Sequence, residues 1–313
     1  MRLGIDPKVD IVFKKIFGSE SNKDLLLELV NAVLEQAGDP LVTQLSILNP
    51  YNIKNFAKDK LSIIDIKAKD KKGDSFAIEV QIQMQSYFPK RLLYYWSKLY
   101  QEQMKEIELY SKLQKVTVIC FTAQDLPIIT PSYYNVYRLL NSQTHQTFCE
   151  DLNIFSIELS KFGNSEDDLD KPVEKWSYFL KNGEDLDAEN LPNKLRIPSI
   201  QKAVREVTMF TQSDIERDIY ENRQKAIRDK ISAETEKYET GKQEGIQIGK
   251  QEGIHIGEQR GIQIGEQRGK QEGVMAEKME AVRNALALGI DVATIHKITG
   301  VSIKEIQKMK KKY

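Results

Sequence analysis

Residues 76–82 read Phe-Ala-Ile-Glu-Val-Gln-Ile, and this alternation of apolar and polar side chains is typical of a β-strand. On such a strand Glu79 and Gln81 share one face, while the apolar residues at 76, 78, 80 and 82 share the other. Residues 61–66 (Leu-Ser-Ile-Ile-Asp-Ile) indicate a second strand that carries Asp65. Because the polar, glycine-containing segment 69–74 suits a hairpin turn, we expect Asp65 and Glu79 on neighbouring strands.

Two neighbouring carboxylates admit two interpretations. Both side chains could simply face solvent on a half-exposed sheet, which is the ordinary outcome for an arbitrary acidic pair. Burial of both would be costly unless a positive charge lies between them, and a hard divalent cation with oxygen ligands is the usual partner. The two residues alone leave the choice between exposure and a metal site open.

Length and composition describe an ordinary charged protein of two or more units. The chain has 313 residues, of which 40% are hydrophobic and 29% charged. A formal net charge of +0 argues against a uniformly basic nucleic-acid coat but permits a local basic groove. Cys120 and Cys149 lie in no CxxC or Cys/His cluster, so we predict neither a zinc site nor a disulfide framework. Since no apolar run approaches a membrane span, we expect a cytoplasmic protein without membrane contact.

The remaining periodicities predict an α/β fold in which helices pack on a sheet. Apolar spacing indicates a helix at 10–18 and a second helix that ends at Gly38. A crossover helix is expected over 88–113, followed by helices around Trp176 and from Ile197 through Lys237. We expect strands at 41–48, 61–66, 76–82 and 116–121, with weaker signals near 133–140 and 154–159.

From Gly241 to Gly273 every fourth residue is glycine, and cassettes such as Lys-Gln-Glu and Ile-Gln-Ile fill the intervals. On a helix this repeat forms a glycine seam that another helix could approach closely. Each helical glycine costs about 1 kcal/mol relative to alanine, so we expect a compensating partner and hence a homodimer or higher oligomer. Helical flanks favour a continuous helix, while an extended strand and a flexible linker remain the alternatives.

Residues 274–313 predict two short helices joined by a turn that contains Gly300 and Ser302. Eight Lys/Arg against four Asp/Glu give this tail a charge of 8 − 4 = +4. A helix-turn-helix DNA reader and a plain helical hairpin both fit this pattern. The inward-facing set is Ile295, Val301, Ile306 and Met309. The predicted units are therefore a core at 1–165, a helical region at 166–240, the repeat at 241–273 and the tail at 274–313.

Four groups of residues follow one another in the first half of the chain: Asp10-x-x-Phe13-Lys14-x-x-Phe17-Gly18, Asp65, Glu79-x-Gln81, and Arg91 followed by Tyr94-Tyr95. Their order and spacing resemble the Rpn family of recombination-promoting nucleases and putative transposases, a branch of the PD-(D/E)XK nuclease superfamily. The resemblance implies a restriction-endonuclease-like core, with a central mixed sheet flanked by helices. It also implies DNA as substrate and a divalent metal, with magnesium as the leading candidate.

The resemblance also assigns roles to individual residues. Asp65 matches the metal-binding aspartate, Glu79 matches the acidic residue of the (D/E)xK pair, and Asp10 matches the acidic residue near the first helix. Gln81 stands where the wider superfamily has lysine, although glutamine is the usual occupant in this branch. Asp65, Glu79 and the backbone carbonyl of Val80 would hold the metal, which acidifies a water for attack on the phosphate.

An uncharged Gln81 leaves a positive charge to be supplied elsewhere. Lys67 follows Asp65 by two residues on the same strand face and is the first candidate, while Lys14 is the second. Arg91 would contact a phosphate or hold a site carboxylate. The leading hypothesis is a metal-dependent DNA endonuclease, and the alternative is an inactive DNA-binding or assembly protein on the same fold. Transfer to water and transfer to a 3′ hydroxyl, as in a transposase, are not distinguished.

Overall fold

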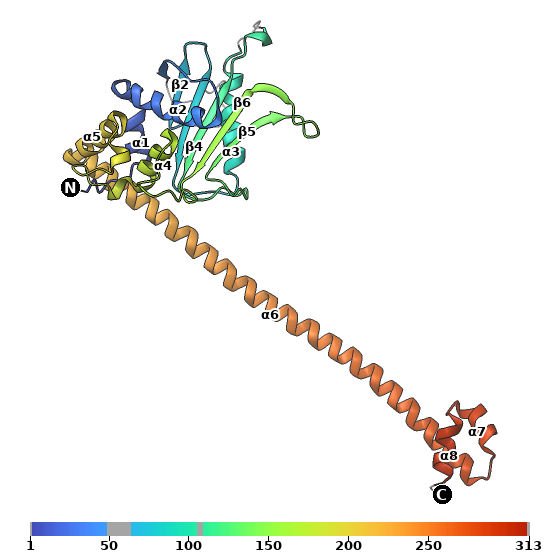
Figure 1. Cartoon of the computed structure of the whole chain (residues 1–313). Coiled ribbons are helices and arrows are strands. Elements are labelled where there is room, and N and C mark those ends of the chain that lie inside the picture. The colour runs from blue at the N-terminus through green and yellow to red at the C-terminus, as the bar shows by residue number, and fades with distance from the viewer. Residues whose placement is uncertain (1, 49–63, 105–108, 312–313) are drawn as a thin grey trace. The chain divides into compact units, whose positions relative to one another are not determined.

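The structure is a computed structural model that describes residues 2–48, 64–104 and 109–311 (Figure 1). Within these residues, six strands form one sheet in the order β1-β2-β3-β4-β6-β5. The β3–β4 and β4–β6 pairs are parallel and the other pairs antiparallel, which confirms the predicted mixed sheet. The strands are β1 (Leu45–Leu48), β2 (Ile66–Asp70), β3 (Ser75–Gln81), β4 (Val116–Thr122), β5 (Tyr134–Leu140) and β6 (Thr147–Glu158).

Helices cover both faces of this sheet and continue into a second unit. The helices are α1 (Asp10–Phe17), α2 (Lys23–Ala37), α3 (Phe88–Gln101), α4 (Pro172–Asn182), α5 (Pro198–Gln212), α6 (Asp214–Ala287), α7 (Val292–Thr299) and α8 (Ile303–Lys310). The chain divides into two compact units, Met1–Arg228 and Asp229–Tyr313. The end of the core domain that the sequence predicts at residue 165 lies inside the first unit.

Strand β3 lies in the interior of the sheet, between β2 and β4. Its residues Phe76, Ile78 and Val80 enter the core formed with α1, α2, α4 and α5, whereas Ala77 enters the core beneath α3. Because helices cover both faces, Glu79 is only 4% exposed, although it carries a carboxylate. Exposure of Glu79 on a half-solvated sheet is therefore wrong.

The crossover from β3 to β4 contains the expected helix, but α3 ends at Gln101 and not at residue 113. The Gln103 side chain explains the early end, because it donates to the Gln114 carbonyl at 3.0 Å and accepts from the Gln114 N–H at 2.8 Å. This reciprocal pair returns the chain to β4. Residues 105–108, within the expected helix, lie outside the described residues.

Two other predicted elements differ in extent. The strand expected over 41–48 begins at Leu45, because the Asn31 side chain holds the Val42 backbone N–H and carbonyl, each at 2.8 Å. The helical tract from 197 breaks at Ser213, whose backbone is extended and whose hydroxyl accepts from the Glu216 N–H at 3.3 Å. This serine starts α6 in the manner of an N-cap. Residues 61–63 of the predicted strand lie outside the described residues.

Helix α4 packs within the first unit, where the Trp176 ring lies 5.3 Å from the Phe17 ring of α1, edge to face. Side chains of α4 and α5 share one hydrophobic core with β3. These two helices therefore complete the covering of one sheet face (Figure 1).

The glycine repeat is helical in the second unit, as α6 passes through residues 241–273 without a break. This confirms the continuous helix over the strand and the linker. The repeat isoleucines are 50–65% exposed, and a Cβ added at any repeat glycine would meet open space. Among the described helices, none combines the length and apolar character needed to cross a bilayer.

Candidate functional site

Asp65 and Glu79 lie side by side where β2 begins and β3 nears its end. Ile66 pairs with Ile78, so the antiparallel register brings Asp65 opposite Glu79. The Asp65 backbone N–H donates to Glu79 Oε1 at 3.0 Å, and the Val80 N–H donates to Asp65 Oδ2 at 3.0 Å. Two hydrogen bonds thus hold both carboxylates in the neighbouring positions expected from the sequence.

Burial raises the proton affinity of both carboxylates. Burial raises the pKa of Glu79 to about 8, and the Asp65 charge adds to this rise. Burial likewise raises the pKa of Asp65, while Lys14 opposes that rise with its Nζ 3.1 Å from Asp65 Oδ1. Like charges in one buried site cannot both ionise without cost. Near neutral pH the pair therefore needs a proton or additional positive charge.

The donor set of this pair fits a hard divalent cation. Carboxylate oxygens of Asp65 and Glu79 and the backbone carbonyl of Val80 are the ligand types that Mg²⁺ prefers. Among the described residues, no group of three or more His, Cys, Asp or Glu side chains could hold a metal. Because Mg²⁺ usually keeps several waters and binds through one or two carboxylates, this small set of protein ligands is compatible with it.

The Gln81 amide is held on both sides at the end of β3. Arg91 on α3 donates from its terminal NH₂ to Gln81 Oε1, and Gln81 Nε2 donates to the Gln83 carbonyl at 2.7 Å. The Arg91 guanidinium carbon lies 4.5 Å from the centre of the Phe88 ring, and its charge opposes the burial-driven rise in the pKa of Glu79. Arg91 therefore contacts the side-chain amide of Gln81, whereas the sequence predicted that it would contact a phosphate or a site carboxylate.

The two candidate lysines have different partners. Lys67 lies in β2 opposite Ala77, but its ammonium group pairs with Glu102 just after α3. Lys14 reaches from α1 to the Asp65 carboxylate. The lysine ranked second from the sequence is thus the one in contact with the carboxylate pair. Strand alternation gave the face of Lys67 correctly but carried no information about Glu102.

Asp10 starts α1 one turn before Lys14. Burial is the main cause of the raised pKa of Asp65, and the Asp10 charge adds to it. The Asp10 carboxylate also accepts a bidentate pair of hydrogen bonds from Arg223. Arg223 Nε lies 2.9 Å from Oδ1, and its terminal NH₂ lies 2.8 Å from Oδ2. Sequence reasoning missed Arg223, since a residue 213 positions away in a charged helix carries no local signal of this contact.

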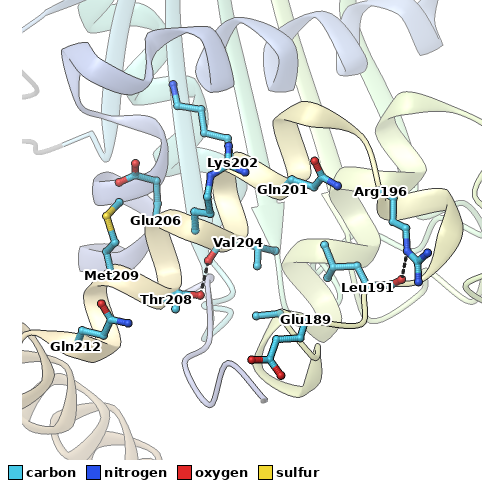
Figure 2. Close-up of a pocket in the computed structure, with 12 residues that line it drawn as sticks. Glu189, Leu191, Arg196, Gln201, Lys202, Val204, Glu206, Thr208, Met209 and Gln212 are labelled. Carbon is cyan, nitrogen blue, oxygen red and sulfur yellow. Dashed lines mark hydrogen bonds between the residues drawn. The ribbon is translucent and has the colours of Figure 1, made fainter.

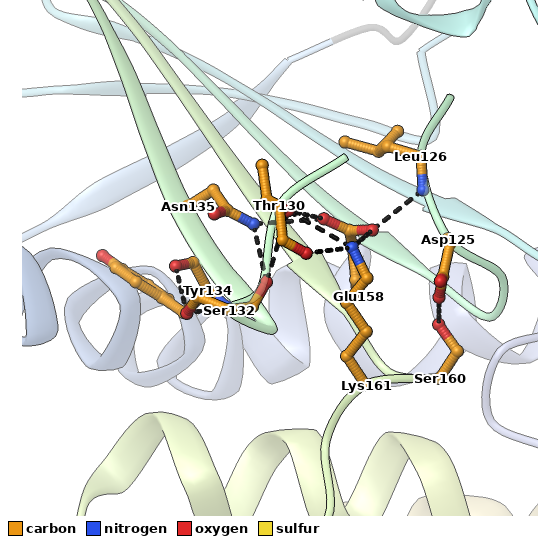
Figure 3. Close-up of polar contacts among 9 residues, drawn as sticks. All are labelled: Asp125, Leu126, Thr130, Ser132, Tyr134, Asn135, Glu158, Ser160 and Lys161. Atoms are coloured by element: carbon orange, nitrogen blue, oxygen red, sulfur yellow. Dashed lines mark hydrogen bonds and ion pairs between the residues drawn. The ribbon is translucent and has the colours of Figure 1, made fainter. Parts of the chain in front are cut away.

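A further buried carboxylate lies on β6 (Figure 3). Glu158 is fully buried and accepts hydrogen bonds from the Leu126 N–H at 2.9 Å and the Thr130 hydroxyl at 3.0 Å. Asn135 donates to the same carboxylate at 3.1 Å, and Lys161 Nζ lies 2.7 Å from it. Because both oxygens are satisfied and neutralised within the chain, Glu158 fixes the β4–β5 connection and offers little to a ligand.

A hollow of about 940 Å³ lies along α5 and the segment before it (Figure 2). Its walls carry both signs of charge, with Arg196, Lys202 and Arg205 against Glu189 and Glu206. None of the candidate site residues lines it. The carboxylate pair and this hollow are therefore separate features of the first unit.

The chain resembles a known protein family over most of its length. A family model described as "PD-(D/E)XK nuclease family transposase" matches residues 7–237. The matched span contains the carboxylate pair, Asp10, Arg91 and also Arg223. No curated protein and no solved structure matches the chain.

Proposed function

This chain belongs to the PD-(D/E)XK nuclease family transposases, and from that premise we propose that it is a divalent-metal-dependent DNA endonuclease. The observation that carries the proposal is the buried Asp65–Glu79 pair, joined by two hydrogen bonds of 3.0 Å. Family membership supports a nuclease-type function and DNA as partner. The raised pKa of Glu79, caused first by burial and then by Asp65, supports a need for a cation at this place.

Each residue of the site has a physical role in this proposal. Asp65, Glu79 and the Val80 carbonyl would hold the ion, for which we propose magnesium. When bound, that ion would neutralise charge on the scissile phosphate and acidify a water. Lys14 opposes the burial-driven rise in the pKa of Asp65 and adds the positive charge that Gln81 lacks.

Gln81 would orient the attacking water. Its Oε1 accepts from Arg91 and its Nε2 donates to Gln83, so each atom retains one further hydrogen-bonding position. Arg91 acts as a positioning residue, because it fixes the amide through a charged hydrogen bond while resting on the Phe88 ring.

A plasmid-nicking assay with magnesium, with and without EDTA, tests the function. We expect cleavage by the wild-type protein in magnesium, no cleavage in EDTA, and loss of at least 100-fold in rate for Asp65→Asn. Asp218→Asn is the matched control, since Asp218 is exposed on α6. Wild-type cleavage retained by well-purified Asp65→Asn protein would refute the assignment.

An inactive DNA-binding or assembly protein on the same fold is the alternative. Two observations favour it: Gln81 is uncharged, and Glu102 holds Lys67. The contact between Lys14 and Asp65 argues for activity. Metal-independent DNA binding without any nicking would support this alternative.

We infer that the working form is a homodimer or higher oligomer joined through the repeat helix. One core supplies one carboxylate pair, whereas cutting both strands of DNA requires two. The exposed isoleucines and open glycines of α6 support a helical partner, which would offset the cost of about 1 kcal/mol per glycine. Light scattering of the full chain tests this, and a strict monomer would contradict it. The cytoplasmic location expected from the sequence stays a prediction.

A further inference from the structure

The second unit ends in two short helices that are capped individually. The Asp291 carboxylate accepts from the backbone N–H groups of Ala293 and Thr294 at 3.0 Å and so starts α7. The Ser302 hydroxyl accepts from the Glu305 N–H at 3.3 Å and starts α8. Between the helices Gly300 has a φ of +69°, a left-handed conformation that glycine adopts without strain. The connection is therefore a short, well-defined turn.

A small core fixes these helices against the end of α6. Val282, Ile295, Val301 and Ile306 are all at most 3% exposed and pack together. Two helices joined by a three- to four-residue turn with glycine, supported by a third helix, are the geometry of helix-turn-helix proteins. In such proteins the second helix enters the major groove of DNA.

Three lysines lie along the outer face of α8 and its C-cap, which is Lys311. Lys304, Lys308 and Lys311 are separated by four and three residues, so they lie on one face over about 10 Å of helix. All three are exposed, and within the described part of the chain none of them forms an ion pair. Ile306 lies on the opposite side and is buried. The inner face of α8 is therefore apolar, and its outer face presents a row of lysines without ion-pair partners among the described residues.

We propose that α8 is a DNA-contacting helix and that the tail is a second, metal-independent DNA site. The proposal rests on the proposed function only in that DNA is the partner. A row of cations complements the phosphate backbone, which dominates the affinity of such contacts. An anionic membrane fits less well, because Ile306 of α8 is buried against Ile295 and Val301, and Ile303, at 43% exposure, is the one apolar side chain of this helix that is exposed.

Fluorescence anisotropy with the full chain in EDTA tests the proposal. The probe is a labelled 30-base-pair duplex of arbitrary sequence, titrated between 50 and 200 mM NaCl. The triple variant Lys304→Gln, Lys308→Gln and Lys311→Gln should lose three phosphate contacts. Each contact contributes about 0.9 to the slope of log affinity against log salt concentration, so the slope should become shallower by about 2.7. We expect affinity at 100 mM salt to fall at least tenfold, with unchanged circular dichroism.

The repeat helix offers a control of identical charge change. Lys242, Lys250 and Lys270 are exposed on α6, and their replacement by glutamine should leave the slope within about 1 of wild type. Arginine at the three α8 positions should restore binding, because it retains the charge.

Three results would overturn the proposal: equal losses in the α8 and control variants, tighter binding of anionic vesicles than of the duplex, or tighter binding of duplex RNA. Failure of the nuclease assignment remains distinguishable. It would appear as absent cleavage in magnesium while the α8 variant still shows its loss of binding in EDTA.

Discussion

Without metal, the first unit of the wild-type protein should become less stable as pH rises. Replacement of Glu79 by glutamine should remove most of this pH dependence. Burial, with a further contribution from Asp65, raises the pKa of Glu79 from 4.5 to about 8. The folded state therefore binds more protons than the unfolded state between these values, and stability falls as pH rises through this window. At about 1.4 kcal/mol per pH unit, the rise corresponds to about 5 kcal/mol of unfolding free energy.

The assay follows the first unit alone, because both tryptophans of the sequence, Trp96 and Trp176, lie in it. Urea titrations in EDTA, monitored by tryptophan fluorescence between pH 5 and 9, should show a wild-type loss of several kcal/mol. The Glu79→Gln protein should lose far less. Glu28→Gln, an exposed change on α2, should follow wild type. Parallel pH curves for wild type and Glu79→Gln would refute the reasoning.

Four further outcomes follow from the site and the repeat. Magnesium should stabilise the wild-type unit more at pH 8.5 than at pH 6, because protons compete with the metal, and equal melting shifts at both values would contradict this. Lys14→Gln should slow nicking about 10- to 100-fold while Lys67→Gln slows it less than about threefold, and the reverse order would transfer the role to Lys67. Arg223→Gln should cost about 1 kcal/mol in urea titrations, since its pair with Asp10 is bidentate yet partly exposed, and an unchanged midpoint would show that the pair is not stabilising. Alanine at three successive repeat glycines should stabilise a free helix by about 1 kcal/mol each but dissociate an oligomer that packs through the seam; an unchanged mass in light scattering would exclude that seam.

Local pattern was sufficient for most of the fold. The β-branched run at 116–121 became β4 in the interior of the sheet, and the segments around it followed the predicted order. Prediction failed where an element ends through a long-range contact. Helix α3 ends at Gln101, where the Gln103 side chain pairs with the backbone of Gln114, although no glycine or proline interrupts residues 102–113 of the predicted helix. Periodicity describes what one segment prefers and says little about which distant groups will compete for its ends.

The site shows the same division. Alternation on two strands and a hairpin turn placed Asp65 beside Glu79, since register follows directly from local pairing. The partners of the charged groups could not be derived in this way. Lys67 on β2 pairs with Glu102 at the end of α3, and Asp10 pairs with Arg223, which lies 213 positions later in the chain. Such pairs depend on how helices pack, and long lysine and arginine side chains reach several places equally well.

The docking of the first turns of α6 determines how this chain can be divided. Glu216 pairs with Lys15 at 2.8 Å, and the Tyr220 hydroxyl accepts from the backbone N–H of Asp6 at 3.0 Å. Together with Arg223, these residues fix the first turns of α6 to the rest of the first unit. A fragment cut at the break between α5 and α6 would lose all three partners. A gene fusion that exchanges the repeat and tail for another module should therefore join after residue 228, where the first compact unit ends.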